Sequence, residues 1–292
     1  MSENCNICPF KCNVNRNQKN LGVCKIGGKI KISYVSTHRW EEPCISGTKG
    51  SGTIFFTGCN LRCVFCQNYK ISRKESEGRE ITEEELAYIF LEKQKEGVHN
   101  INLVSPTPYI SYIKKAIITA KNKGLIIPIV YNSNGYENAE SIKELDGLID
   151  VYLPDFKYAD DILAKKYSGA INYKESAVKA IKEMYRQVGN AKFNKDSIIQ
   201  KGIIIRHLVL PNNIENSKKV LKEIADNIDK KVYISLMGQY IPQDKSCKYE
   251  ELNRKITNEE YDEVIDYFFE VGLTNGFMQE LDSASEKYIP NF

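Results

Sequence analysis

The sequence lacks long apolar runs, and this absence excludes a membrane-spanning helix. No segment approaches the ~18 consecutive apolar residues that a bilayer span needs. The chain of 292 residues is nevertheless 42% hydrophobic, which is enough for a sizeable core. The opening residues, Met1 to Cys5, are polar and lack the apolar stretch of a secretory signal. We therefore expect no membrane association and a cytoplasmic location.

A strong excess of charge is also missing. The 41 Lys and Arg residues oppose 38 Asp and Glu residues, which leaves a net charge of +3. There is no basic stripe with interleaved aromatic residues of the kind that nucleic-acid-binding proteins carry. The composition therefore does not favour nucleic acid as a partner. A protein, a peptide and a small molecule all remain open as substrates.

Cysteine is nearly absent from the last three quarters of the chain. Of nine cysteines, eight lie within the first 66 residues, and only Cys247 lies beyond them. In a chain without a secretion signal, clustered cysteines indicate metal or redox chemistry rather than disulfides. The metal chemistry is therefore predicted to lie in the N-terminal quarter.

Three of these cysteines, Cys59, Cys63 and Cys66, lie within eight residues directly after the apolar run 53–57. This spacing suits a cubane iron–sulfur cluster better than a zinc site. Three thiolates leave one iron of a [4Fe–4S] cluster without a protein ligand, and an open position is where a substrate or cofactor binds. A purely structural metal site would close its coordination.

The other N-terminal cysteines belong to a short, loop-rich segment, residues 1–48. Such a polar segment has few apolar residues with which to build a core and usually needs a metal to hold it. A set of four thiols suggests a closed site, and both a second [4Fe–4S] cluster and zinc remain open. The predicted ligands are Cys5, Cys8, Cys12 and Cys24.

From residue 53 onward the pattern alternates between short apolar strands and amphipathic helices. Two helices begin with a capping box, Thr82 with Glu85 and Thr257 with Glu260. Six strand–helix units predict a mostly parallel sheet, and both an open doubly wound sheet and a partial barrel fit this alternation. The predicted strands are 53–57, 100–104, 125–131, 149–153, 202–210 and 231–236, and the predicted helices are 82–96, 109–123, 159–167, 173–188, 216–228 and 257–271.

Several motifs accompany the cysteine loop. They are Cys5–Cys12, Gly22–Cys24, Glu41–Pro43, Gly50–Phe56, Cys66–Tyr69, Tyr131–Tyr136, Leu153–Tyr158 and Arg206–Pro211. Together with the loop, these motifs resemble those of the PflX-type radical S-adenosylmethionine (SAM) proteins, relatives of pyruvate formate-lyase activating enzyme. The resemblance implies a partial (β/α)6 TIM-like barrel over residues 49–292, with a Cys-rich metal-binding module over residues 1–48.

The resemblance also implies an activity. Cys59, Cys63 and Cys66 would ligate a [4Fe–4S] cluster whose open iron binds SAM. An electron from the cluster would cleave SAM to a 5′-deoxyadenosyl radical that abstracts a hydrogen atom. The chain would then be an activating-enzyme-like oxidoreductase that acts on a glycyl-radical protein, on a peptide or on a small molecule. Its electron donor would be a flavodoxin or ferredoxin.

Further positions resemble the SAM-binding elements of the superfamily, and most of them lie at the ends of strands. Phe65 would line the adenine, and Lys157 would help to hold the SAM carboxylate. Arg206 would be a second anion partner or a counter-charge to the cluster. The residues predicted at these positions are Phe65, Asn132, Ser133, Asn134, Asp155, Lys157 and Arg206.

One element departs from the superfamily. Most members carry Gly-Gly-Glu after the second strand, and this element meets the SAM amino group. Here the stretch 104–109 contains no carboxylate, and Ser105 and Thr107 are the candidate replacements.

A rival hypothesis is a non-catalytic metal protein, either an iron–sulfur electron carrier or a zinc scaffold. Such a protein would need no SAM pocket, so the elements at 132–135, 155–157 and Arg206 argue against it.

Overall fold

The computed structural model describes residues 4–18, 21–73 and 78–281. Residues 1–3, 19–20, 74–77 and 282–292 of the two predicted domains lie outside this part. The strands are β1 (Ile30–His38), β2 (Ser51–Phe56), β3 (Arg79–Ile81), β4 (Ile101–Val104), β5 (Ile129–Ser133), β6 (Val151–Pro154), β7 (Lys192–Phe193), β8 (Ile199–Leu208), β9 (Tyr233–Met237) and β10 (Gly276–Met278). The α-helices are α1 (Pro43–Ser46), α2 (Tyr69–Ser72), α3 (Glu83–Lys95), α4 (Ile110–Asn122), α5 (Ala139–Lys143), α6 (Asp161–Ser168), α7 (Tyr173–Val188), α8 (Ile214–Asn227) and α9 (Asn258–Glu270).

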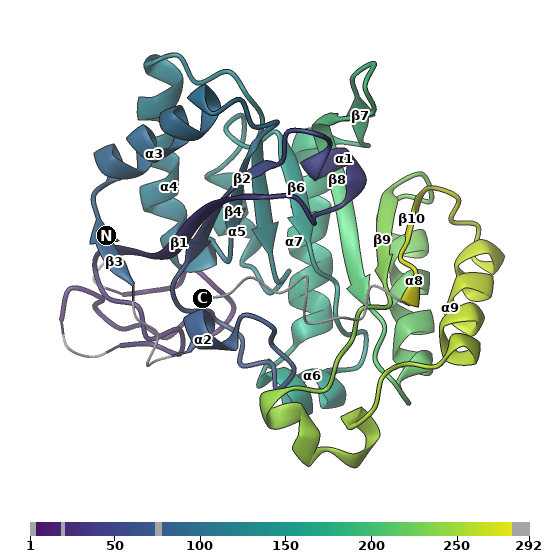
Figure 1. Ribbon diagram of the computed structural model, residues 1–292. Coiled ribbons are helices and arrows are strands. Elements are labelled where there is room, and N and C mark those ends of the chain that lie inside the picture. The colour runs from purple at the N-terminus through teal and green to yellow at the C-terminus, as the bar shows by residue number, and fades with distance from the viewer. Residues whose placement is uncertain (1–3, 19–20, 74–77, 282–292) are drawn as a thin grey trace.

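The described strands form one sheet in the order β10-β9-β8-β6-β5-β4-β2-β1-β3. The strands from β2 to β10 along this path are parallel and follow chain order, as they do in a barrel that is wound in one direction. In the described residues no ladder joins β3 to β10, so the barrel stays open. Figure 1 shows α3 and α4 outside one end of this sheet and α8 and α9 outside the other. The predicted partial (β/α) barrel is confirmed.

Successive side chains of each strand point to opposite faces of the sheet, one toward the outer helices and the other toward the inside of the barrel. Ile54, Leu103 and Ile203 are buried in the main core that the outer helices cover. Their neighbours Phe55 and Val104 point to the other face and line the barrel interior. Parallel strands that are covered on both faces are near-continuous apolar runs, and this is what made them predictable from the sequence.

Both predicted capping boxes form. The Thr82 hydroxyl accepts from the Glu85 amide at 3.1 Å, and the Glu85 carboxylate accepts from the Thr82 amide at 2.8 Å. Thr257 and Glu260 repeat this arrangement at α9. Satisfying the first free N–H groups in this way sets the start of each helix.

Two features of the sheet differ from the sequence prediction. β10 is a further parallel strand, and its three residues are too few to show an apolar pattern. Residues 189–201, between the predicted helix 173–188 and the predicted strand 202–210, also contain sheet: β7 pairs with the start of β8, and Ile198 and Ile199 are buried.

The N-terminal segment is joined to the barrel by hydrogen bonds of the sheet itself. β1 belongs to the predicted module of residues 1–48, yet it pairs antiparallel with β2 from Ile32 to His38. After β1, Cys44 and Ile45 of α1 pack against Val130 and Val151 and close the interior near the start of the parallel strands. The predicted division at residue 48 therefore does not interrupt the sheet.

Candidate active site

The cysteine loop 59–66 leaves the C-terminal end of β2. Gly58 has φ +82°, a left-handed conformation that glycine adopts without strain, and it turns the chain out of the strand. Two backbone bonds fix the loop on the end of α6, from Arg62 N to Ser168 O at 3.0 Å and from Val64 N to Tyr167 O at 2.8 Å. The loop is thus fixed between the first parallel strand and a helix more than 100 residues away in sequence.

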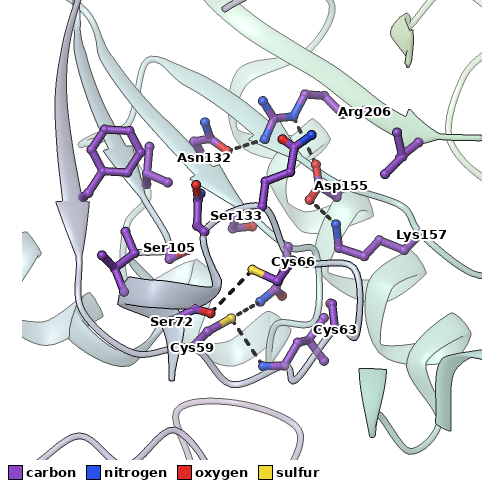
Figure 2. A pocket seen from close by; sticks show the side chains of 18 of the residues that line it. Cys59, Cys63, Cys66, Ser72, Ser105, Asn132, Ser133, Asp155, Lys157 and Arg206 are labelled. Carbon is purple, nitrogen blue, oxygen red and sulfur yellow. Dashed lines mark hydrogen bonds and ion pairs between the residues drawn. The ribbon is translucent and has the colours of Figure 1, made fainter. Parts of the chain in front are cut away.

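Each thiol of this loop has a hydrogen-bonding partner. Asn134 Nδ2 donates to Cys59 Sγ at 3.2 Å, and the buried Ser168 hydroxyl donates to Cys63 Sγ at 3.0 Å. The third thiol, Cys66, lies 3.5 Å from the hydroxyl of Ser72. Figure 2 shows Cys59 and Cys66 side by side at the floor of the pocket, with Ser72 beside them.

Burial changes the protonation of two of these thiols, which are soft metal ligands. Burial raises the pKa of Cys59 to about 12 and the pKa of Cys63 to about 11. Both thiols are therefore protonated at neutral pH when no metal is bound. Because the thiolate is the form that ligates a metal, metal binding displaces these protons. Three thiols that line one pocket, each with a hydrogen-bonding neighbour, fit the ligand set of an iron–sulfur cluster.

A charged network lies along another wall of the pocket. Asp155 accepts from Lys157 Nζ at 2.5 Å and from Arg206 Nε at 3.0 Å. The same guanidinium donates to Asn132 Oδ1 at 2.6 Å and to Glu41 Oε2 at 3.2 Å. Figure 2 shows Arg206, Asp155 and Lys157 linked in this way across the pocket from Cys59. Strands β5, β6 and β8 bring these side chains together at their C-terminal ends.

The pKa values in this network follow from mutual charge. Burial by itself would raise the pKa of Asp155, but Lys157 and Arg206 more than offset it and lower that pKa. Burial would likewise lower the pKa of Lys157, and the Asp155 charge raises it instead. Burial raises the pKa of Glu41 in spite of the neighbouring Arg206. The pocket therefore holds two fixed cations, which suits an anionic ligand.

These groups surround a pocket of about 230 Å³ at the C-terminal ends of the strands. The three loop cysteines are in its lining, as are most of the residues predicted to bind SAM. Those predicted residues are Phe65, Ser105, Asn132, Ser133, Asn134, Asp155, Lys157 and Arg206. Ser105 has φ +58°, which is rare for a residue with a side chain and typical of functional sites.

Thr107 lies elsewhere. It is not part of the pocket lining, and its hydroxyl donates to Glu137 Oε1 at 2.6 Å in the core. The same carboxylate accepts from the Tyr131 hydroxyl at 3.4 Å, while its second oxygen has no partner among the described residues. Thr107 therefore braces the loop after β5 rather than contacting a ligand directly.

Several residues that shape the site were not predicted from the sequence. Glu41 enters the pocket from the segment after β1, and Ser168 reaches Cys63 from the end of α6. Asn60 accepts from Asn134 Nδ2 at 2.7 Å and donates to Tyr136 O at 2.6 Å, which ties the cysteine loop to the loop after β5. Only Glu41 carried a signal in the sequence, as part of the motif 41–43.

His207, Cys44 and Cys247 lie outside the pocket lining. His207 is fully buried between Phe156 O at 2.7 Å and Ser217 Oγ at 2.9 Å, and burial lowers its pKa to about 4. It is a neutral core histidine. Cys44 is buried in the small core below the pocket, and Cys247 is exposed.

The four N-terminal cysteines form a second group outside this pocket. They are partly exposed. Burial, together with the nearby Cys24 and Cys12, raises the pKa of Cys8 to about 12, and burial, together with Cys5 and Cys12, raises the pKa of Cys24. The side chain of Arg16 is buried beside them and hydrogen-bonds to Ile26 O at 3.2 Å and to Pro108 O. Across the described residues, no three His, Cys, Asp or Glu side chains are grouped so that they could hold one metal ion.

We expect Gly135→Ala to destabilise the protein at the turn that follows β5 and carries Asn134. Gly135 has φ +74°, and an added Cβ would lie 1.9 Å from Asp155 O. A left-handed alanine costs about 1–2 kcal/mol, and overpacking adds about 1–3 kcal/mol or more. Chemical denaturation measures the resulting decrease in the free energy of unfolding. Gly147→Ala is the matched control because it has φ +75° and open space around it. If both variants lost the same free energy of unfolding, the close approach of Gly135 to Asp155 O would be refuted.

Glu137 predicts a pH-dependent stability. Burial raises its pKa from 4.5 to about 7. Its contribution to stability is then fully present below pH 4.5 and is lost as the pH rises through 7, by about 3 kcal/mol. Glu137→Gln should remove this dependence, whereas the exposed Glu144→Gln should keep it. Denaturation curves from pH 4.5 to 8 test this, and parallel curves for all three proteins would contradict it.

Comparison with known proteins supports the architecture. Residues 53–199 match the model of the Radical SAM superfamily. The uncharacterised protein MJ0674 of Methanocaldococcus jannaschii is 34% identical over 277 residues, which cover 90% of this chain and 74% of that protein.

Solved structures share the fold at low identity. Streptococcus suis SuiB bound to S-adenosylmethionine has a TM-score of 0.54 at 15% identity, covering 79% of this chain and 52% of SuiB. TYW1 with a lysine-pyruvate adduct bound has a TM-score of 0.55 at 14% identity, and the match covers 86% of this chain and 87% of TYW1. The chain thus spans about half the length of SuiB. No helix in the described part of the chain is long and apolar enough to span a bilayer.

Proposed function

The chain belongs to the radical SAM superfamily, and from that premise we propose that its pocket binds SAM over Cys59, Cys63 and Cys66 and uses it to abstract a hydrogen atom. Membership of this family of enzymes implies a [4Fe–4S] cluster and SAM as cofactors. When bound, they supply reductive cleavage of the sulfonium and a radical that takes a hydrogen atom from the substrate. The observation that carries the proposal is the convergence of three thiols and two buried cations on one pocket.

The protein's own part is to hold and orient SAM. Lys157 and Arg206 are fixed by Asp155, so their positive charges are in place before a ligand binds. We assign the SAM carboxylate to these cations and the adenine to the neighbourhood of Phe65. Ser105, whose left-handed backbone follows β4, replaces the missing Gly-Gly-Glu element beside the amino group. The buried walls exclude water and so protect a reactive species from side reactions.

A protein glycine is the substrate that we propose within this chemistry. The motifs shared with relatives of pyruvate formate-lyase activating enzyme support it. SuiB has been solved bound to a precursor peptide, which makes a peptide the second candidate. Deuterium transfer from a labelled glycine into 5′-deoxyadenosine would support the first class. Transfer from a peptide side chain would contradict it.

We also propose that Cys5, Cys8, Cys12 and Cys24 bind a second iron–sulfur cluster. Zinc needs its ligands around a single ion, whereas each cysteine of a cluster binds a different iron. All four thiols are partly exposed and lie in one short segment, where they form a ligand set of four. Iron, sulfide and zinc analysis of Cys12→Ala tests the proposal. Loss of zinc alone would contradict it.

SAM affinity tests the proposed pocket. We expect Lys157→Met to weaken SAM binding to the reconstituted protein by about 10- to 100-fold, because a charge-assisted hydrogen bond is worth about 1.5–3 kcal/mol. Lys166→Met, on the outer surface of α6, is the control and should bind as the wild type does. Equal affinity in all three proteins would place SAM elsewhere.

A further inference from the structure

The thiol of Cys63 has hydrogen-bonding surroundings that differ from those of the other two loop thiols. Ser168 Oγ donates to Cys63 Sγ at 3.0 Å, and the Tyr158 hydroxyl lies 2.7 Å from the same Ser168 oxygen. Ser168 is 1% exposed and Tyr158 is fully buried, so water does not compete for these hydroxyls. Cys66, by contrast, lies 3.5 Å from Ser72, which is partly exposed. Cys63 is thus at the end of a buried chain of two hydroxyls.

The backbone brings Cys63 to this chain. The carbonyl of Ser168, the last residue of α6, accepts from Arg62 N at 3.0 Å. The carbonyl of Tyr167 accepts from Val64 N at 2.8 Å. The N–H groups on either side of Cys63 therefore satisfy the last carbonyls of the helix, which have no partner within it. Figure 1 shows α6 at the end of the sheet where the parallel strands finish.

Tyr158 is fixed as firmly from the other side. Asn216 of α8 accepts from the backbone N–H that follows Tyr158 and donates to the carbonyl that precedes it, both at 3.0 Å. The Tyr158 ring packs edge-on against Tyr173 with ring centroids 5.3 Å apart. Among the residues that the structure describes, Ser168 is the one hydrogen-bonding partner of the Tyr158 hydroxyl. This hydroxyl is therefore held toward Ser168.

Metal ligation fixes the direction of these hydrogen bonds. A thiolate that ligates a metal has no S–H group and can only accept, so Ser168 donates to Cys63. The Ser168 oxygen is then the acceptor for Tyr158, whose hydroxyl donates. Both O–H groups therefore point toward the sulfur, and hydrogen bonds that are aligned in a chain strengthen one another in a low-dielectric interior. The arrangement stabilises negative charge on the sulfur of Cys63.

We propose that Tyr158 and Ser168 are a positioning pair that makes the cluster of the loop 59–66 easier to reduce, with Ser168 acting on the Cys63 sulfur and Tyr158 acting through Ser168. The inference rests on the proposed function. Reduction by an external one-electron reductant adds one negative charge to the cluster, and a hydrogen bond to a ligating sulfur favours the more negative state. The pair breaks no bond and transfers no proton.

A purely structural role is the other explanation for two buried hydroxyls that bond to each other. Such a role affects stability, because Ser168→Ala leaves the buried Tyr158 hydroxyl without its described partner. It does not shift a reduction potential through a residue that has no hydrogen bond to a cysteine. The double variant Ser168→Ala/Tyr158→Phe removes both hydroxyls, so it can be measured even if the single Ser168 variant folds poorly.

Reductive titration with dithionite, followed by electron paramagnetic resonance, tests the pair in the reconstituted protein without SAM. The signal that Cys63→Ala lacks belongs to the loop 59–66, which separates it from any other iron. At the wild-type midpoint potential, Ser168→Ala should lower the ratio of reduced to oxidised cluster by about three- to tenfold, since only part of a charge-assisted hydrogen bond differs between the two oxidation states. Tyr158→Phe should lower it by about twofold, because it only strengthens the first hydrogen bond.

Tyr152→Phe is the matched control, because Tyr152 is also fully buried and its hydroxyl also bonds a side chain, that of Gln187, at 2.6 Å. It should leave the ratio unchanged. The double variant should equal Ser168→Ala. A wild-type ratio in Ser168→Ala, or a further decrease on adding Tyr158→Phe to it, would overturn the pair. Absence of the Cys63-dependent signal from the wild type would instead refute the proposed function.

Discussion

Cys63→Ala is expected to abolish assembly of the active-site cluster and to leave the N-terminal centre intact. Cys63 is the most buried of the three loop thiols, and it is the one that Ser168 contacts. Alanine removes the ligand, and the Ser168 hydroxyl keeps only its hydrogen bond with the Tyr158 hydroxyl at 2.7 Å. Two thiolates then remain for a cluster that needs three, so iron and sulfide should fall by the content of one cluster.

The controls make this result specific. Cys247→Ala changes an exposed thiol and should retain all the iron. Cys12→Ala should lose iron from the second centre alone. If Cys63→Ala kept the iron and sulfide content of the wild type after reconstitution, the loop 59–66 would not be the cluster site.

Arg206→Leu is expected to cost the fold about 3–5 kcal/mol, the range for breaking a buried ion pair by removing one partner. Arg206 contacts Asp155 and Glu41, and the side chains of all three are at most 16% exposed. Leucine would leave Glu41 without a cation and would leave Asp155 with Lys157 alone. The loss should shrink at acid pH, since protonation removes the uncompensated charge of the carboxylates.

Denaturation at constant metal content measures this loss. Lys179→Leu is the control, because Lys179 pairs with Glu175 on the surface, where the two side chains are 65% and 63% exposed. Water screens that pair, so its removal should change stability little. If the two leucine variants were equally stable, the buried network would not be an organising element of the pocket.

The sequence predicted the strand–helix alternation because its signals are local. Apolar runs such as 203–205, the caps at Thr82 and Thr257 and the cysteine spacing can each be recognised within a few residues. Strand ends of a parallel barrel meet at one edge, so Asn132, Asp155 and Arg206 could be expected together. The comparisons confirm the superfamily, while the PflX-type assignment stays a prediction.

What the sequence could not supply depends on contacts between distant segments. Ser168 and Cys63 are 105 residues apart, and no local pattern relates them. Glu41 reaches Arg206 because β1 runs antiparallel to β2 and brings the following segment beneath the sheet. Thr107 was placed at a strand end correctly, but its rotation toward Glu137 is decided by packing in the core.

The most direct test of the central claim is 5′-deoxyadenosine formation from SAM. The protein is reconstituted anaerobically with iron and sulfide and then mixed with SAM and dithionite, beside Cys63→Ala. The account predicts product from the wild type and none above background from the variant. A wild-type protein that carries its full iron and sulfide and yields no 5′-deoxyadenosine would contradict the account. It would favour an electron-transfer role for the same metal centres.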